Sequence, residues 1–360
     1  MQSNFDKMLR RLIFLALILP VACIEPYKLD VPEGEQLLMV EATITSGPGP
    51  HAVTLTRTAT YGSIFEALIR PVTQATVAVR DESGATTILT ESSEARGSYF
   101  TSASFQAEIG KSYTLLIETI DGKTYASRPE KVESVPALEN VGIRTVVIDQ
   151  AGGENPRSGI QVIAEVNDPG DQNNFYYWRN GPATYVLETR PDLYTPPTSP
   201  ANPDRIPQPK PCCFTCYRTE ISSNRSMFVE TDDDFNGLTT HIPVAFIEDD
   251  GRRFVRTFRI DVKQLGISQE AYRFLRLVKQ QAEISGSVFD PPPATIRGNM
   301  TSLDNPEEVV LGYFIAAGET TKRIYVNNSD LTFHQNNALI PDDCLTVQGT
   351  SVSPPADWKP

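Results

Sequence analysis

Short runs in which apolar and polar residues alternate recur along most of the chain, separated by clusters of Gly, Pro, Asp and Asn. Alternation with a period of two is typical of half-buried strands, and such clusters are typical of turns. In the first part of the chain the expected strands are short and recur about every 8–12 residues, which indicates a β-sandwich. They cover residues 37–44, 53–57, 75–80, 86–90, 97–100, 113–118 and 123–127. We therefore predict an immunoglobulin-like or transthyretin-like sandwich domain over residues 37–133.

The pattern continues in a larger β-rich domain, predicted over residues 134–345, that holds one α-helix. Ser268 is a good helix N-cap, and Tyr272, Leu275 and Val278 then fall on one face, which predicts a helix over about 268–284. The expected strands are 141–149, 160–166, 173–179, 226–230 and 253–262, with a closing hairpin of 309–316 and 322–326. The fold class is thus mainly β, and residues 346–360 are expected to form a C-terminal tail.

A proline-rich loop interrupts the second domain. Residues 190–211 contain eight prolines, and proline cannot donate a hydrogen bond to a sheet ladder. Long loops are commonly functional, so one interpretation is an interaction surface. The alternative is that the loop packs across a sheet edge and protects it.

Composition narrows the range of functions. The 360 residues include 32 Lys plus Arg against 45 Asp plus Glu, a formal net charge of −13. A nucleic-acid binder needs a basic face to neutralise phosphates, so we expect no nucleic-acid partner. The chain has only three His, which argues against a His-rich metal site.

The N-terminus has the layout of a secretory signal. Lys7, Arg10 and Arg11 form a basic start, and Leu12–Leu19 is an apolar run too short to span a bilayer. Ala22 then precedes Cys23, as in a lipoprotein signal, although the usual Leu three residues before the Cys stands one place earlier, as Leu19. The alternative is a plain secretory signal followed by a chance cysteine.

On the lipoprotein interpretation, residues 1–22 are removed and residues 23–36 form a tether that carries covalent lipid on Cys23. Two or three acyl chains hold a protein firmly on a membrane. The protein would then be anchored to the membrane and would not span it.

The other four cysteines are expected to form disulfides, because an even set outside the cytoplasm favours them. They are Cys212, Cys213, Cys216 and Cys344. Since adjacent cysteines rarely bond each other, we predict that one of Cys212 and Cys213 pairs with Cys216 and the other with Cys344. The rival interpretation is a zinc site built from all four thiolates.

An acidic turn matches the first half of the sequence pattern of a calcium-binding loop. Asp232, Asp234 and Asn236 occupy its first, third and fifth positions, and Gly237 occupies the sixth. The twelfth position is Pro243, where the loop needs a bidentate Glu. A polar turn is the preferred interpretation, with calcium as the alternative; no other cofactor is expected.

Catalysis has little support in the sequence. No Gly-x-Ser-x-Gly, His-Glu-x-x-His or phosphate-cradling Gly-rich motif is present. Tyr176, Tyr177 and Trp178 could form a sugar platform or contact a partner, although aromatic strand residues commonly belong to a core. We therefore expect a protein that is not an enzyme, with these three aromatic residues as candidate partner contacts.

Several short motifs, in a particular order, carry a resemblance to a known family. They are Glu25-Pro26-Tyr27 after Cys23, the Pro71–Ser127 module with its Gly97-Ser98-Tyr99, Phe235-Asn236-Gly237, Ser285-Gly286-Ser287-Val288-Phe289-Asp290-Pro291, Arg297-Gly298-Asn299 and Leu311-Gly312-Tyr313-Phe314. In this order they resemble a family of Bacteroidota outer-membrane lipoproteins, domain of unknown function four-two-four-nine. The module itself resembles small sandwiches found beside carboxypeptidases and on outer-membrane receptors.

The resemblance implies location and association, and no established activity. Members of the family are outer-membrane lipoproteins, often encoded beside a TonB-dependent receptor. We therefore expect a non-catalytic accessory or ligand-capturing subunit that is anchored in the outer membrane and docks on such a receptor or another β-barrel. The alternatives are a free-standing surface adhesin or structural module and, with less support, a polysaccharide-active enzyme.

Overall fold

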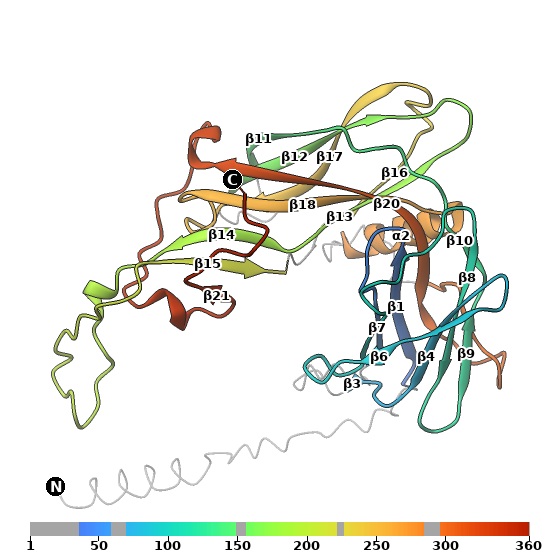
Figure 1. Cartoon of the computed structure of the whole chain (residues 1–360), viewed down its shortest axis with the longest axis horizontal. Helices are drawn as coiled ribbons and strands as arrows, with labels where there is room; N and C mark the ends of the chain where they lie inside the picture. Colours follow the sequence, from blue (N-terminus) through green and yellow to red (C-terminus); the bar gives the residue numbers. More distant parts are fainter. Residues whose placement is uncertain (1–35, 59–69, 149–155, 222–226, 284–295, 360) are drawn as a thin grey trace, which may run out of the picture. The chain divides into compact units, whose positions relative to one another are not determined.

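The computed structural model describes residues 36–58, 70–148, 156–221, 227–283 and 296–359 (Figure 1). The described chain is mainly β, with one α-helix, which confirms the predicted fold class. The predicted signal peptide, Cys23 and nearly all of the tether lie outside the described residues. Among those residues, no helix is both long enough and apolar enough to cross a bilayer.

Two sheets enclose a first core. One sheet contains β1 (Leu38–Thr45), β2 (Ala52–Arg57), β3 (Arg70–Pro71), β6 (Thr90–Glu91), β7 (Ser98–Phe100) and the first half of β20 (Leu311–Asn327). The other contains β4 (Thr76–Asp81), β5 (Thr86–Ile88), β8 (Ser112–Glu118), β9 (Thr124–Ser127), β10 (Glu130–Lys131) and β19 (Met300–Ser302). Alternate residues of both sheets fill this core, for example Val40, Val77 and Leu115. The alternation in the sequence is therefore that of a sandwich.

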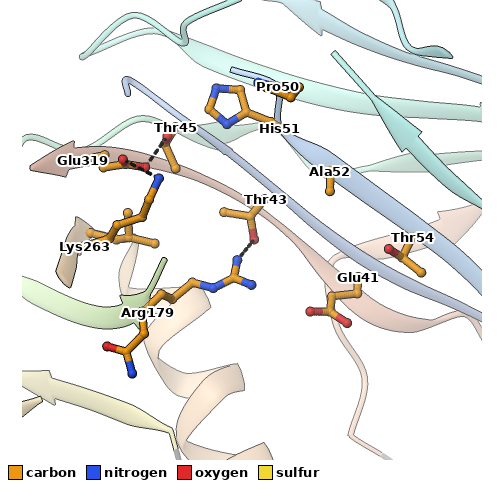
Figure 2. Close-up of a pocket in the computed structure, with 12 residues that line it drawn as sticks. Glu41, Thr43, Thr45, Pro50, His51, Ala52, Thr54, Arg179, Lys263 and Glu319 are labelled. Carbon is orange, nitrogen blue, oxygen red and sulfur yellow. Dashed lines mark hydrogen bonds and ion pairs between the residues drawn. The ribbon is translucent and has the colours of Figure 1, made fainter. Parts of the chain in front are cut away.

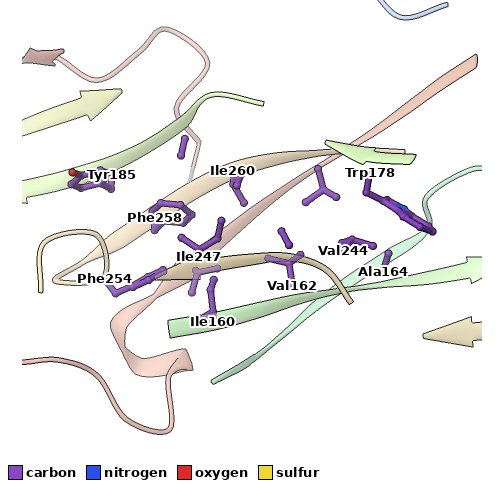
Figure 3. Close-up of a cluster of buried hydrophobic side chains, with 14 of the residues drawn as sticks. Ile160, Val162, Ala164, Trp178, Tyr185, Val244, Ile247, Phe254, Phe258 and Ile260 are labelled. Atoms are coloured by element: carbon purple, nitrogen blue, oxygen red, sulfur yellow. The ribbon is translucent and has the colours of Figure 1, made fainter. Parts of the chain in front are cut away.

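A second pair of layers encloses a larger core, and one of these layers continues the sheet that contains β1. A three-stranded sheet of β11 (Asn140–Ile148), β12 (Arg157–Asn167) and β17 (Thr239–Glu248) forms one layer. The other holds β13 (Phe175–Asn180), β14 (Ala183–Glu188), β15 (Thr215–Glu220), β16 (Phe228–Thr231), β18 (Thr257–Gly266), β21 (Thr350–Ser351) and the second half of β20. Figure 3 shows Ile160, Val162, Trp178, Phe258 and their neighbours meeting between these layers.

The long strand β20 corrects the predicted closing hairpin. Residues 311–327 form one continuous strand, with no turn between the two expected halves. The first half pairs in parallel with β1, and the second half pairs antiparallel with β18. Residues 313–318 are all buried and residues 319–325 are half-buried or exposed, and two different partner strands hold the two halves in line. As a result, β20 joins both sandwiches through a single 12-stranded sheet.

Strand pairing crosses the sequence-predicted domain boundary at residue 133. Late strands β19 and β20 pair with β9 and β1 of the first sandwich. The boundary itself remains a prediction. The pairing of β19 and β20 shows that strands from late in the sequence complete the first sandwich.

The helix α2 (Gln269–Ala282) confirms the predicted helix closely. The Ser268 side chain caps it by accepting a hydrogen bond from the backbone N–H of Ala271. Ala271 and Leu275 are buried against Tyr313 and Ile315 of β20 in a third, smaller core. The helix therefore covers the face of β20 that points away from the first sandwich.

The disulfide pairing differs from the prediction. Cys216 bonds Cys344, and Cys212 bonds its neighbour Cys213. Cys216 lies in β15 with its side chain fully buried, where it meets the equally buried Cys344. Cys212 and Cys213 precede the strand, and their shared peptide bond is cis. Cys216 and Cys344 both lie in the second core, which brings these two side chains together and leaves Cys212 and Cys213 to each other.

Candidate ligand-binding cleft

Two adjoining pockets on the outer face of β1 form one cleft with a polar end and an apolar end. The polar pocket has a volume of about 230 Å³, and the apolar pocket has about 780 Å³. Glu41, Thr43 and Arg179 line both pockets and so mark their junction. The apolar pocket alone is within the range of about 300–1,000 Å³ common for small-molecule sites.

The alternation of β1 creates the floor of the cleft. Its buried positions, such as Val40 and Ile44, face the first core. The intervening positions Met39, Glu41 and Thr43 therefore face outward, into the cleft.

The apolar end lies under α2. Phe274, Leu275 and Val278 of the helix face Tyr313 and Ile315 of β20 across this pocket. Tyr177 of β13 and Met227, the residue before β16, add further apolar surface. Helical spacing of three and four residues brings the three helix side chains to one face, so the helix forms a continuous apolar wall.

The polar end contains an ion pair that is already complete. Lys263 Nζ donates to Glu319 Oε1 at 2.8 Å, and Thr45 Oγ1 donates to Glu319 Oε2 at 2.7 Å (Figure 2). Burial acts to raise the pKa of Glu319, but the hydrogen bonds from Lys263 and Thr45 outweigh it and lower the pKa. Glu319 is therefore charged at neutral pH and holds Lys263 in place.

The junction carries a second pair of opposite charges that do not contact each other. Arg179 Nη1 donates to Thr43 Oγ1 at 3.4 Å, a long hydrogen bond, and Figure 2 shows its guanidinium pointing into the cleft. Within the described chain, no carboxylate lies within 4.0 Å of this guanidinium. The side chain of Glu41 is exposed, and in the same view it lies on the neighbouring stretch of β1. Glu41 is exposed and Arg179 is half-buried, and both line the pockets at their junction, where a ligand can reach them.

His51 closes the far wall of the polar end. It is buried, with its ring edge-on to Phe105 at 5.8 Å between centroids. Burial lowers the pKa of His51, although the nearby Glu319 opposes the shift. The imidazole is therefore neutral at pH 7, and among the described residues its Nε2 has no hydrogen-bond partner.

A buried polar network lies behind the apolar end and fixes its walls. Glu130 accepts hydrogen bonds from Ser268 Oγ, from Tyr313 OH at 3.1 Å and from Asn299 Nδ2 at 3.3 Å. Burial raises the pKa of Glu130, and the three neutral donors only partly offset this. The network links β10, the N-terminus of α2 and β20, and so it sets the helix against the strand that it faces.

Two of the motifs that carried the family resemblance meet in this network. Asn299 Oδ1 accepts from the Phe314 backbone N–H at 2.9 Å, and Asn299 Nδ2 donates to the Phe314 carbonyl at 2.8 Å. Gly312 has φ +91°, and a Cβ there would lie 1.8 Å from the Val40 carbonyl oxygen. Only glycine allows this approach of β20 to β1. The motifs around Asn299 and Gly312 therefore support the cleft floor.

The structure places the predicted aromatic contacts on two different faces. Tyr176 and Trp178 are buried in the second core, so the prediction that they contact a partner is wrong. Side chains alternate along β13, and Tyr177 therefore points the other way, into the apolar end of the cleft. The same alternation directs Arg179 to the cleft.

The three calcium candidates do not converge. Asp232 is buried, and its Oδ2 accepts from the Asn174 backbone N–H at 2.8 Å. Asp234 and Asn236 are exposed, and the Asn236 amide donates to the Gln172 carbonyl at 3.3 Å. Nowhere in the described residues do three or more His, Cys, Asp or Glu side chains form a group suited to a metal. Calcium binding remains the untested alternative to the predicted polar turn.

The proline-rich loop joins β14 to β15 and extends beyond the ends of both strands in Figure 1. It begins with the short 3-10 turn η1 (Pro191–Leu193), and most of its later residues are exposed. Lys210 forms an ion pair with Asp342 and stacks its ammonium over the Tyr194 ring at 4.2 Å. The loop is thus fixed at its base, and the strand that pairs with the free edge of β15 is β21. This favours an interaction surface over protection of a sheet edge.

The charged residues of the cleft had no signature in the sequence. Glu41, Arg179, Lys263 and Glu319 come from four strands spread over most of the chain. The alternation in β1 and β13 could have separated their inward from their outward positions. The meeting of these strands depends on long-range pairing, which no local motif encodes.

Comparison with protein families gives a match over most of the chain. The family model described as Domain of unknown function (DUF4249) matches residues 24–323. These residues include every wall of the cleft, the Glu130 network and the proline-rich loop. Comparison with the curated proteins gives no match.

Proposed function

The chain belongs to the family described as Domain of unknown function (DUF4249), and on that premise we propose that it is a non-catalytic, lipid-anchored protein of the outer membrane. Its role is to capture a ligand as an accessory subunit of a TonB-dependent receptor or another β-barrel. The anchor is the lipid on Cys23.

The observation that carries the proposal is the cleft. It is formed by strands of one continuous sheet and one helix, and hydrogen bonds on both sides hold its walls. Pockets of this kind, apolar with a few placed polar groups, are typical of ligand sites. Arg179 and Glu41 supply such groups at the junction.

The proline-rich loop supports the accessory role. It is exposed, it is anchored at its base by Lys210 and Asp342, and it presents the apolar side chain of Ile206. Loops held on a rigid scaffold commonly carry binding functions. We propose that the loop contacts the barrel and that the cleft remains open to ligand.

A mild-detergent pull-down of the tagged full-length protein from its native membrane tests this role. Mass spectrometry of the eluate should identify a stoichiometric TonB-dependent receptor or other β-barrel. Ile206→Asp should lose that partner, whereas Ile88→Asp, a similarly exposed isoleucine on β5, should keep it. A clean monomer from the wild type would reject the accessory role and favour a free-standing adhesin.

A further inference from the structure

We propose that the cleft binds a zwitterionic amphiphile, with its hydrocarbon chain in the apolar end and its head group at the junction. The anionic group of the head would bind Arg179, and its cationic group would bind Glu41. This inference rests on the proposed ligand-capturing function and specifies the class of ligand.

The apolar end of the cleft is suited to the hydrocarbon chain of the ligand. Its walls are side chains of α2 and β20, among them Phe274, Val278 and Ile315, with Met39 of β1 at the open side. Its volume of about 780 Å³ is more than three times that of the polar end, about 230 Å³. An apolar space of this size gains most from an extended hydrocarbon, because burial stabilises in proportion to apolar area.

The charges at the junction of the two pockets indicate which head group the ligand carries. Lys263 and Glu319 already satisfy each other at 2.8 Å, so they offer little net charge to a ligand. Arg179 has a guanidinium whose one described hydrogen bond, to Thr43, is long at 3.4 Å. A planar guanidinium with free donors is well suited to a phosphate or carboxylate.

Glu41 favours a zwitterionic head group over a purely anionic one. It lines both pockets at the point where Arg179 does, and it is exposed. A head group with only negative charge would meet Arg179 but would be repelled by Glu41. A head that pairs a phosphate with an ammonium, such as phosphoethanolamine, satisfies both charges at once.

The experiment labels the full-length, membrane-anchored protein in its own cells. Cells are grown with a diazirine-bearing palmitic acid, which enters their lipids, and are irradiated before purification. Mass spectrometry of the digested protein then reports the modified peptide and the head group of the attached lipid. We expect adducts on peptides of α2, residues 269–282, that carry a zwitterionic phospholipid.

Matched variants test each part of the site. Val278→Trp should fill the apolar end and reduce labelling at least tenfold, whereas Leu277→Trp, on the exposed side of the same helix, should not. Arg179→Met should also reduce labelling about tenfold, and Arg144→Met on β11 should leave it unchanged. Glu41→Gln should retain labelling but shift the adducts toward lipids with purely anionic heads.

Several outcomes would overturn the inference. These are wild-type adducts dominated by free fatty acid or anionic lipid, cross-links from the acyl chains of Cys23 itself, no adduct on α2, or labelling that survives Arg179→Met. Failure of the accessory role looks different, because the pull-down would then lack a barrel while α2 is still labelled. A barrel recovered together with an unlabelled α2 would reject the zwitterionic ligand alone.

Discussion

Glu130 of β10 and Glu319 of β20 both have buried carboxylates, and their pKa values shift in opposite directions because their partners differ. Glu130 has only neutral donors, and burial raises its pKa above the ordinary 4.5. Glu319 has Lys263 beside it, and its pKa is lowered despite its burial. The same side chain therefore opposes folding at one site and supports it at the other when the pH is neutral.

We expect Glu130→Gln to gain stability relative to the wild type as the pH rises. The folded wild type holds the Glu130 proton more tightly than the unfolded chain does, so its free energy of unfolding falls between the unfolded and the raised folded pKa. The amide avoids this loss. The difference between the two proteins should grow by at most about 1.4 kcal/mol per pH unit and then level off. Urea unfolding between pH 4 and pH 8 measures it.

Glu319→Gln is the control of opposite sign. Its pKa is lowered in the folded state, so its contribution to stability is present above the unfolded pKa and is lost as the pH falls through the lowered folded pKa. This variant should therefore be least stable relative to the wild type at pH 8. Parallel pH profiles for the two variants would contradict both assignments.

Asn299→Ala should destabilise the protein by about 2–5 kcal/mol. The Asn299 amide satisfies both backbone groups of Phe314, and the residue is 1% exposed. Truncation leaves a buried N–H and a buried carbonyl unpaired, each at a cost of about 1–3 kcal/mol. Asn140→Ala, an exposed asparagine bonded to Glu165, should change the free energy of unfolding by less than about 0.5 kcal/mol. Equal effects in thermal unfolding would reject the proposed role of Asn299.

At the level of elements, the helix was readable from the sequence because its signals are local. Ser268 caps it and an apolar face follows at helical spacing, and the structure has the same helix. Strand β20 was misread because its partners are far away in the sequence. Its two halves pair with β1 and β18, and nothing within residues 309–326 encodes that arrangement.

We expect the packing of α2 to depend more on Leu275 than on Leu277. Leu275 is 5% exposed and packs against β20, whereas Leu277 is 48% exposed. Leu275→Ala should therefore cost about 2–5 kcal/mol, and Leu277→Ala less than about 0.5 kcal/mol. Denaturant unfolding of the two variants checks this. Similar losses would mean that the helix does not pack on β20 in this register.

On the scale of the whole molecule, the sandwich class was predictable from alternation, but the cleft was not. Arg179 is in a predicted strand, next to the three aromatic residues predicted as partner contacts. Its position on β13 shows that it faces the cleft, as Tyr177 does. The walls of the cleft meet because β20 closes the first sandwich and extends the second. Such a site is a property of topology, for which this sequence has no short motif.

The disulfide between Cys216 and Cys344 should stabilise the whole chain. It spans 128 residues and ties the C-terminal segment to β15, so it removes much entropy from the unfolded chain. Replacing both cysteines by serine should cost about 2–5 kcal/mol. The bond between Cys212 and Cys213 closes almost no loop, so replacing these two cysteines by serine serves as the control. Non-reducing peptide mapping should link Cys344 to Cys216; a link from Cys344 to Cys212 or Cys213 would contradict the structure.

Membrane attachment should depend on Cys23 alone. It is the one cysteine that follows a basic start, an apolar run and a small residue, which is the context for acylation. Cys23→Ala should therefore leave the protein unlipidated and extractable by carbonate, whereas Ile24→Ala should remain in the membrane pellet. Because carbonate also strips proteins held only by a partner, the wash separates a lipid anchor from docking on a barrel. Wild-type behaviour of Cys23→Ala after the wash would reject the lipid anchor, and docking on a barrel would not account for it either, because carbonate removes proteins held only by a partner.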